Sequence, residues 1–475
     1  MPRVLTATLP SLIWWLGLLT ALRALYLFFV PLPLSGDEAQ YWVWAQSLDW
    51  GYYSKPPLLA WMIALTTSIG GDSEPWVRLF SPLAHGVTAL FLGLTALRLR
   101  DEQTGFWVGI GYAALPAVFF SSLLISTDVP LLLFLSVWLY CCVRASDSPR
   151  WLIAAGFALG LAALSKYAAL FLLPAYLAHG HSLKQYRMVG LGLVVMLLCL
   201  APNLWWNAQH GFITFAHTEA NIQGGGFRLN PLDALAFIGE QAGVIGALFL
   251  LLFAVVLKPR RLDFGQNTAL LWLSLLPLLL ITGQALLSRA NANWGVSAYI
   301  GGMVLIGVAA SMRGWLPWLR RAVFFNATLG ALLLTLPWLA AELPLKKDPL
   351  RKIRGYEQLT AAFLEKRAAE CPECAVVTRD RMPTAWLRYY GRGVLNSENV
   401  FIFDPNQKPT NHFSLCCRFD EKTPTPLLYF ARAGEPLLFS QFATVEPRGE
   451  ITVMPRPDQR LTFTVVYLDG YKGHD

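Results

Sequence analysis

The strongest constraint on this chain is a series of eleven long apolar segments, all of which precede Glu342. A hydrophobic stretch of about 20 residues crosses the hydrocarbon core of a bilayer as a helix, because a helix satisfies its own backbone hydrogen bonds. The sequence therefore predicts an all-α polytopic membrane protein with about 11 transmembrane helices. The apolar segments are residues 9–30, 76–97, 105–123, 127–143, 151–164, 167–178, 188–206, 233–257, 268–287, 294–311 and 322–341.

The composition favours the same fold class. Of the 475 residues, 55% are apolar and only 14% are charged, whereas soluble domains carry about 25% charged residues. The net charge of +8 is attributed to basic residues that orient the membrane helices, so we expect no nucleic-acid partner. Residues 9–30 are longer than the apolar region of a cleavable signal peptide and are expected to remain as an anchor.

The loops predict the topology, because cytoplasmic loops are enriched in Lys and Arg. Residues 151–178 allow two interpretations, either one long span or a hairpin of two short helices that turns at Lys166. Only the hairpin keeps the basic cluster at 258–261 on the same side as the other basic loops, so we favour it. The N-terminus is then cytoplasmic in a bacterial inner membrane, and residues 31–75 and 342–475 face the periplasm. The basic residues that follow the last apolar segment leave a cytoplasmic C-terminal tail as the alternative.

Two domains follow from this topology. Residues 1–341 form the transmembrane domain, and residues 31–75 are its first periplasmic loop, in which Leu58–Ile69 is expected to be an interfacial or re-entrant helix. Residues 342–475 are predicted to form a small α/β extracytoplasmic domain. Its helical pattern covers 355–369, and its β-like runs are Ala375–Thr378, Val400–Phe403, Leu427–Phe430 and Leu461–Tyr467.

Four cysteines lie in the C-terminal domain, namely Cys371, Cys374, Cys416 and Cys417. They could form two disulfides or one zinc site. Outside the cytoplasm, disulfides are the favoured alternative.

Charged and aromatic residues are concentrated in the first periplasmic loop. Asp37, Glu38 and Tyr41 open a predicted helix over residues 37–48. Residues i and i+4 share a helix face, so Asp37 and Tyr41 can point into one cleft. Ionised groups near a bilayer are costly and are often functional. The simpler alternative is that Asp37 caps the helix, and capping is compatible with catalysis.

Lys55 follows two tyrosines, Tyr52 and Tyr53, and precedes two prolines that stiffen the backbone. A fixed ammonium group at this position could bind a phosphate. The alternative is a lysine that extends its charged end to the membrane interface.

Asp128 lies at the outward start of the fourth apolar segment, so it returns to the same predicted face as Asp37. An acidic residue just before Pro130 is also an ordinary helix start. Arg289 and Asn293 lie in a later outward turn and are further candidates for substrate binding.

Several of these motifs, in this order, resemble the bacterial dolichyl-phosphate-mannose–protein mannosyltransferase-like superfamily. This superfamily includes the aminoarabinose transferases of lipid A and the galacturonosyl transferases of lipopolysaccharide core. The resemblance covers about residues 10–340 and implies a C-type glycosyltransferase fold. The motifs are Asp37-Glu38-Ala39-Gln40-Tyr41, Tyr53-Ser54-Lys55-Pro56-Pro57-Leu58, Thr127-Asp128, Gly160-Leu161-Ala162-Ala163-Leu164-Ser165-Lys166-Tyr167, and Ala292-Asn293-Trp294 with Tyr299.

The resemblance implies an inverting enzyme that uses a polyprenyl-phosphate sugar on the periplasmic side. By motif position, Asp37 would be the main catalytic carboxylate and Asp128 its partner, and Lys55 would contact the lipid phosphate. The remaining predicted donor-binding residues are Glu38, Tyr41, Tyr52, Tyr53, Arg289 and Asn293.

One position departs from the aminoarabinose transferases, in which the residue before the Lys-Pro-Pro sequence is acidic and is linked to a metal. Here that residue is Ser54. A divalent metal therefore stays open, and no other cofactor is expected.

The chemistry is consistent with this resemblance. A lipid-phosphate leaving group needs a cation such as Lys55, and an acceptor hydroxyl needs a base such as Asp37. Basic residues after the last apolar segment suit an anionic acceptor lipid such as lipid A, lipopolysaccharide core or another glycolipid. They are Lys346, Lys347, Arg351, Lys352 and Arg354.

Two other functions are weighed against this one. The first is a protein O-mannosyltransferase-like enzyme, which would use a protein acceptor. The second is a transporter or flippase for lipid-linked sugars. Transporters usually show inverted repeats and broken helices at the midplane, whereas this chain concentrates its acids at one surface, which favours an enzyme.

Overall fold

The computed structural model describes residues 7–223, 229–257, 266–340, 348, 350–404, 406, 408–433 and 439–473. The chain divides into two compact units. The helical unit comprises Met1–Phe29 and Lys55–Leu336, and the mixed unit comprises Val30–Ser54 and Pro337–Asp475. The first periplasmic loop is therefore divided, because its residues up to Ser54 pack with the C-terminal part of the chain.

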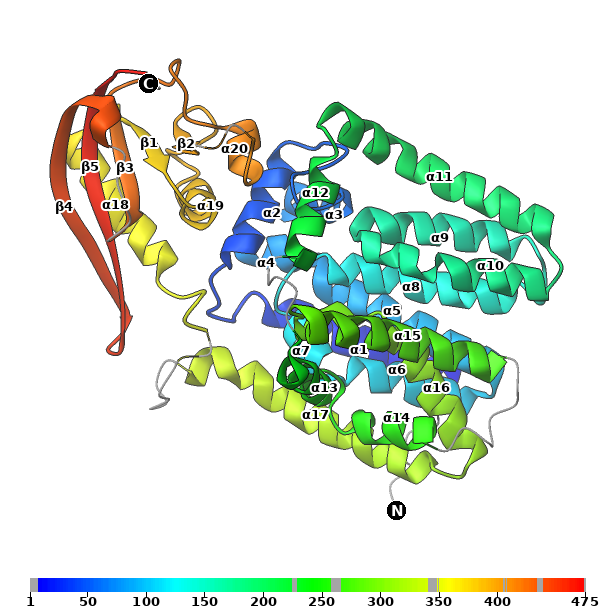
Figure 1. Cartoon of the computed structure of the whole chain (residues 1–475). Helices are drawn as coiled ribbons and strands as arrows, with labels where there is room; N and C mark the ends of the chain where they lie inside the picture. Colours follow the sequence, from blue (N-terminus) through cyan, green and yellow to red (C-terminus); the bar gives the residue numbers. More distant parts are fainter. Residues whose placement is uncertain are drawn as a thin grey trace. The chain divides into compact units, whose positions relative to one another are not determined.

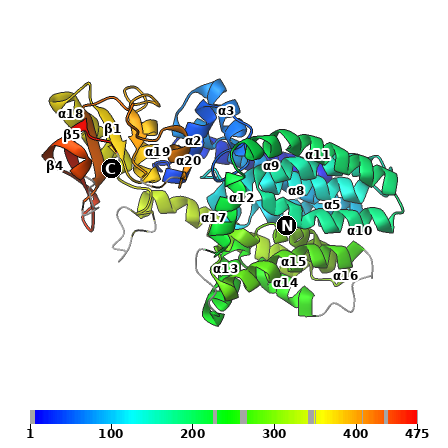
Figure 2. The same ribbon diagram turned by 45° about the horizontal axis from the view of Figure 1, so that its top comes forward.

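The helical unit begins with α1 (Leu9–Tyr26), α3 (Leu58–Gly70), α4 (Glu74–Arg78), α5 (Phe80–Leu99), α6 (Glu102–Ala113), α7 (Pro116–Ser121), α8 (Asp128–Arg144) and α9 (Trp151–Ser165). It continues with η1 (Tyr167–Leu172), α10 (Leu173–Ser182), α11 (Tyr186–Gln209), α12 (Ile213–Gln223), α13 (Pro231–Ile245), α14 (Leu248–Leu257), α15 (Gln266–Leu287), η3 (Ala292–Gly295), α16 (Ala298–Met312) and α17 (Leu316–Leu339). Helices α8, α9 and α11 run side by side, as Figures 1 and 2 show.

Five helices in the described part of the chain are long and apolar enough to cross a membrane. They are Leu9–Tyr26, Glu74–Leu99, Tyr186–Gln209, Thr268–Leu287 and Leu316–Leu339. Each of the eleven predicted apolar segments contains helix, but eleven transmembrane spans are not confirmed because most of these helices are shorter. The mostly helical architecture is confirmed.

Some segments that were expected to be continuous are broken, and two of these breaks have an evident cause. Segment 105–123 is interrupted between α6 and α7, where Pro116 starts the second helix. Segment 233–257 is interrupted at Gly246, whose φ of 60° is left-handed. Asn326 fills this break, since it accepts a hydrogen bond from Ala247 N (2.9 Å) and donates one to Ile245 O (2.9 Å). Buried polar backbone freed by a break needs such partners.

The predicted hairpin at Lys166 is confirmed. Helix α9 ends at Ser165, and the chain then turns back, so that the Tyr176 hydroxyl donates to Leu152 O at 2.8 Å. Close packing against α11 holds α9 in place, because a Cβ atom on Gly156 would lie 2.1 Å from the carbonyl oxygen of Gly192. The basic cluster at 258–261, on which the topology argument relied, lies outside the described residues.

The mixed unit contains α2 (Gly36–Gln46), α18 (Tyr356–Glu370), β1 (Ala375–Thr378), α19 (Arg381–Tyr390), β2 (Val400–Ile402), α20 (His412–Cys416), β3 (Leu427–Arg432), η4 (Phe439–Gln441), β4 (Phe442–Arg456) and β5 (Gln459–Tyr471). Its sheet has the order β2-β1-β3-β5-β4. Strand β1 is parallel to β2 and β3, and the other pairs are antiparallel. The predicted α/β character is confirmed.

Strand β4 was missed, although the other four strands were predicted. Its sequence contains Pro447 and Gly449, which normally indicate a turn. The strand accommodates them because its register against β5 shifts between Pro447 and Glu450. An edge strand tolerates this irregularity because one side of it makes no ladder hydrogen bonds.

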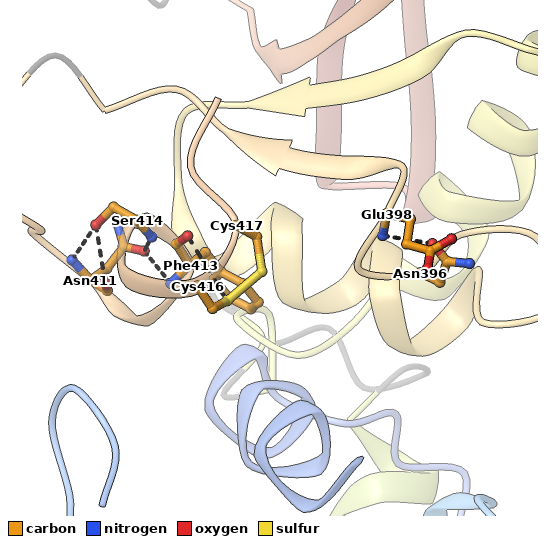
Figure 3. Close-up of a disulfide and its surroundings, with 7 residues drawn as sticks. All are labelled: Asn396, Glu398, Asn411, Phe413, Ser414, Cys416 and Cys417. Atoms are coloured by element: carbon orange, nitrogen blue, oxygen red, sulfur yellow. Dashed lines mark hydrogen bonds between the residues drawn. A yellow bond between two sulfur atoms is a disulfide. The ribbon is translucent and has the colours of Figure 1, made fainter. Parts of the chain in front are cut away.

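The four C-terminal cysteines take the first of the two predicted forms. Cys371 pairs with Cys374, and Cys416 pairs with Cys417. Figure 3 shows the second disulfide at the end of α20. That helix is started by Asn411, whose side chain accepts hydrogen bonds from the backbone N–H groups of Phe413 (2.9 Å) and Ser414 (3.1 Å).

Candidate active site

Asp128 in the helical unit is the centre of a buried polar cluster. Asp128 is only 8% exposed to solvent. Lys166 Nζ donates to Oδ1 at 2.7 Å, and Asn293 Nδ2 donates to Oδ2 at 2.7 Å. Both carboxylate oxygens therefore have a donor, as a buried charge requires.

Three helix boundaries bring these side chains together. Asp128 is the first residue of α8, and Lys166 lies in extended backbone between α9 and η1. Asn293 lies in η3, whose carbonyl of Ala292 accepts a hydrogen bond from Gln241 Nε2 (3.3 Å). Helix ends leave backbone groups and side chains free to point at one site.

The structure brings the predicted site residues Asp128 and Asn293 into contact. Lys166, which also binds Asp128, was not predicted as a site residue. The sequence does contain a signal for it. Lys166 is a single cation between two apolar runs, where a charge is costly unless it has a partner.

A second polar group lies beside Lys166 in the chain. The Tyr167 hydroxyl donates to Asn203 Oδ1 at 2.7 Å and accepts from Asn207 Nδ2 at 3.2 Å. The Tyr167 ring stacks on Phe215 with centroids 4.6 Å apart. These contacts fix the residue next to Lys166 and so limit the movement of the lysine.

The two predicted phosphate-binding cations also lie in the helical unit. Lys55 is half-buried just before α3, and Arg289 is exposed between α15 and η3. Their roles stay predictions.

Asp37 lies in the first turn of α2, in the mixed unit, where the helix dipole favours a negative charge. The helix is capped by Ser35, not by Asp37. Ser35 N donates to Glu38 Oε2 (2.9 Å), and Glu38 N donates to Ser35 Oγ (3.3 Å). This reciprocal pair is a capping box. The simpler alternative for Asp37 is thus wrong, and its side chain is left 52% exposed.

Asp37 has a partner that was not predicted. Arg381 Nη1, at the start of α19, donates to Asp37 Oδ1 at 2.8 Å and to Gln40 Oε1 at 3.1 Å. Glu38, by contrast, is 2% exposed and is used by the cap. Its predicted contact with the donor stays untested.

Two of the three predicted tyrosines pack against Trp44. Tyr41 lies with its ring centroid 5.0 Å from that of Trp44, and Tyr52 stacks on the same ring at 4.7 Å. The Tyr52 hydroxyl donates to Trp44 O (3.0 Å), and burial raises the pKa of Tyr52. Tyr53 is half-buried, and burial together with the charge of Asp404 raises its pKa. The phenols of Tyr52 and Tyr53 are therefore neutral at physiological pH.

His412 of α20 packs against the same aromatic group. Its ring meets Trp44 edge-on at 5.5 Å and Tyr52 at 5.9 Å. Burial, with a smaller contribution from the charge of Arg388, lowers the pKa of His412 to about 3. The folded protein therefore holds this histidine neutral at pH 7.

This predicts a stability change with pH. Between the unfolded pKa of about 6.5 and the folded value, only the unfolded chain takes up the proton, so stability falls as pH falls through this window. The free energy of unfolding at pH 5 is expected to be about 1–2 kcal/mol lower than at pH 7. His412→Phe keeps the ring contacts and removes the titration.

The measurement is the unfolding temperature of the purified protein in detergent from pH 7.5 to 4.5. The unfolding temperature of His412→Phe should rise relative to that of the wild type as the pH is lowered. A constant difference across this range would show that His412 is not held neutral by the fold.

The described residues offer no donor set for a metal. In the parts of the chain that the structure describes, no three His, Cys, Asp or Glu side chains come together as a possible metal site. Ser54 likewise supplies no carboxylate before Lys55. The question of a divalent metal stays open, as the sequence left it, and no step of the chemistry below uses one.

Several known proteins are similar to this chain. Residues 54–206 match the dolichyl-phosphate-mannose-protein mannosyltransferase family, and this range includes Lys55, Asp128 and Lys166. Lipid A galacturonosyltransferase RgtD of Rhizobium johnstonii is 39% identical over 295 residues, which is 60% of this chain. The aligned part spans 62% of the length of RgtD.

More distant relatives cover more of the chain. Undecaprenyl phosphate-alpha-4-amino-4-deoxy-L-arabinose arabinosyl transferase of Pseudomonas aeruginosa is 26% identical over 401 residues, 71% of this chain and 72% of that protein. ArnT from Cupriavidus metallidurans bound to undecaprenyl phosphate has 16% identity and a TM-score of 0.66 over 95% of this chain and 98% of its own.

The shared fold and the long apolar helices identify a multi-pass membrane protein. Its resemblance to the mannosyltransferase-like proteins, inferred from the motifs, is confirmed. Residues 54–206 resemble the dolichyl-phosphate-mannose-protein mannosyltransferase family, and the chain has the fold of ArnT.

Proposed function

We propose that this protein transfers a sugar from a polyprenyl-phosphate donor to a lipid A or related glycolipid acceptor, on the periplasmic side of a bacterial inner membrane. Residues 31–75 and 342–475 then face the periplasm. The observation that carries the proposal is the buried Asp128, which lies inside the family match and is held on both oxygens by Lys166 and Asn293. A helix that only spans a membrane needs no such cluster.

The relatives support the donor and the acceptor. RgtD is a lipid A galacturonosyltransferase by name, the arabinosyl transferase is named for an undecaprenyl phosphate sugar, and ArnT has been solved with undecaprenyl phosphate bound. In the mixed unit, Arg351 and Lys352 are exposed, as a contact with an anionic lipid requires. Lys346 and Lys347 lie outside the described residues.

The proposed step is a single displacement. An acceptor hydroxyl oxygen attacks the anomeric carbon, the bond from that carbon to the phosphate oxygen breaks, and its electron pair leaves with the polyprenyl phosphate. This displacement inverts the anomeric centre. The proton of the acceptor goes to a carboxylate, and Lys55, assisted by Arg289, stabilises the charge that develops on the phosphate.

The two carboxylates suit different roles. Asp37 is half exposed and makes one ion pair, so it can take a proton from an incoming hydroxyl. Asp128 is buried and bound on both oxygens. A carboxylate has about four acceptor positions, so Asp128 can still accept a hydrogen bond from a sugar hydroxyl while Lys166 and Asn293 keep it in place.

The sugar is proposed to be a uronic acid. The identity of 39% to a galacturonosyltransferase exceeds the 26% to an aminoarabinose transferase. Ser54 also departs from the aminoarabinose transferases at the position before Lys55.

The test is a transfer assay with the purified full-length protein in proteoliposomes. Radiolabelled polyprenyl-phosphate galacturonic acid and the corresponding aminoarabinose donor are supplied separately with lipid A as acceptor. We expect label in lipid A from the first donor and at least about tenfold less from the second. Equal absence of transfer from both donors would refute the proposal.

A further inference from the structure

Asp37 is held by a residue from the far end of the chain. Arg381 is separated from it by 344 residues, yet its Nη1 donates to Asp37 Oδ1 at 2.8 Å. The same nitrogen donates to Gln40 Oε1 at 3.1 Å, so one guanidinium bridges two side chains of α2. All three residues belong to the mixed unit.

The position of Arg381 is fixed by the packing of α19 on α2. Trp386 Nε1 donates to the carbonyl oxygen of Leu34 (3.1 Å), and the N–H of Leu34 donates to the Tyr390 hydroxyl (2.8 Å). Gly36 lets the helices approach closely, because a Cβ atom there would lie 2.2 Å from the sulfur of Met382. Helix α19 is thus anchored without the ion pair.

The ion pair itself adds little to this anchoring. The side chains of Arg381 and Asp37 are 36% and 52% exposed, and exposed ion pairs contribute little to stability. What the bridge does is restrict the rotamer of Asp37. Gln40 is 3% exposed, so its side chain is fixed by its surroundings. The guanidinium group of Arg381 is held in place by its hydrogen bond to Gln40, and it therefore binds the Asp37 carboxylate in one orientation.

We infer that Arg381 is a positioning residue, which orients the Asp37 carboxylate toward the acceptor hydroxyl. This inference rests on the proposed function, in which Asp37 is the base. Catalytic groups must be held within about 0.5 Å of the productive geometry. The C-terminal part of the chain would then be required for chemistry and not only for substrate capture.

The test compares variants of the full-length protein in the transfer assay. Arg381→Ala is expected to lower kcat by about 10- to 100-fold, because misplacing a reacting group by about 1 Å costs this much. The KM for the donor should stay within about twofold and the unfolding temperature should not change, since the pair is exposed. Arg381→Lys should recover part of kcat, because it keeps the charge but loses the bridge geometry.

The chain offers a matched control on β4. Arg448 pairs with Glu446 at 2.6 Å, and their side chains are 35% and 53% exposed, close to the values for Arg381 and Asp37. Arg448→Ala should therefore leave kcat unchanged. A wild-type kcat in Arg381→Ala would overturn the inference, and so would a loss of kcat that follows a fall in unfolding temperature and is not recovered by lysine.

The inference and the proposed function fail in different ways. If the wild-type protein transfers no sugar, the proposed function is wrong. If the wild type transfers sugar and Arg381→Ala does so equally well, only the role of Arg381 is wrong.

Discussion

Asp37→Asn is expected to reduce sugar transfer by about 10²- to 10⁴-fold, the range that a positioned general base contributes. The amide has nearly the shape of the carboxylate but cannot accept the acceptor proton. Because Ser35 and Glu38 cap α2, the substitution should not disturb the helix. Expression and donor binding should therefore be retained.

The assay measures initial rates in proteoliposomes together with binding of labelled donor. Asp49→Asn is the control, since Asp49 is an exposed carboxylate just beyond the end of α2. We expect this control to keep the wild-type rate. Turnover preserved in Asp37→Asn would show that Asp37 is not the base.

Lys166→Ala should have the second largest effect, on both stability and activity. The substitution leaves Asp128, with its side chain 11% exposed, without its cation. Removing one partner of a buried pair costs about 3–5 kcal/mol, and with Lys166 21% exposed we expect about 2–4 kcal/mol. Activity should fall as well, because the carboxylate is no longer fixed.

A double variant separates the effect on stability from the effect on activity. Combining Lys166→Met with Asp128→Asn removes both charges, so most of the stability should return, since replacing a buried pair by neutral groups is often close to neutral. The activity should stay low, because Asp128 is no longer a carboxylate. Equal stability of Lys166→Ala and the wild type in thermal unfolding would contradict the ion pair.

The membrane part of the fold was largely predictable because apolar length and helix formation are local properties. The turn at Lys166 followed from the pattern of loops. The breaks at Pro116 and Gly246 were missed. At Gly246 the chain leaves the helix because Asn326, 80 residues away, satisfies the freed backbone groups.

In the mixed unit too, the features set by local sequence were predictable, and those set by distant contacts were not. The predicted strand at Ala375–Thr378 agrees with β1 because short β-branched runs between turn signals are informative by themselves. Strand β4 was not predictable, since pairing with β5 overrides the turn signals at Pro447 and Gly449. Local preference yields to tertiary contacts in such strands.

The sequence suggests a list of candidate site residues, but it does not predict the contacts that these residues make. Asp37 and Asp128 were identified as charges near a bilayer that need a reason to be there. Their partners, Arg381 and Lys166, come from distant parts of the chain. One sequence contains no record of which cation meets which acid, so only the folded structure could assign these pairs.

The most direct measurement is the stoichiometry of a single turnover in proteoliposomes loaded with donor and lipid A. An enzyme that cleaves the sugar from its carrier should release one polyprenyl phosphate for each lipid A molecule that gains the sugar, and Asp37→Asn should release neither product. Carrier that crosses the bilayer with its sugar still attached, without glycosylated lipid A, would contradict the transferase and identify a flippase.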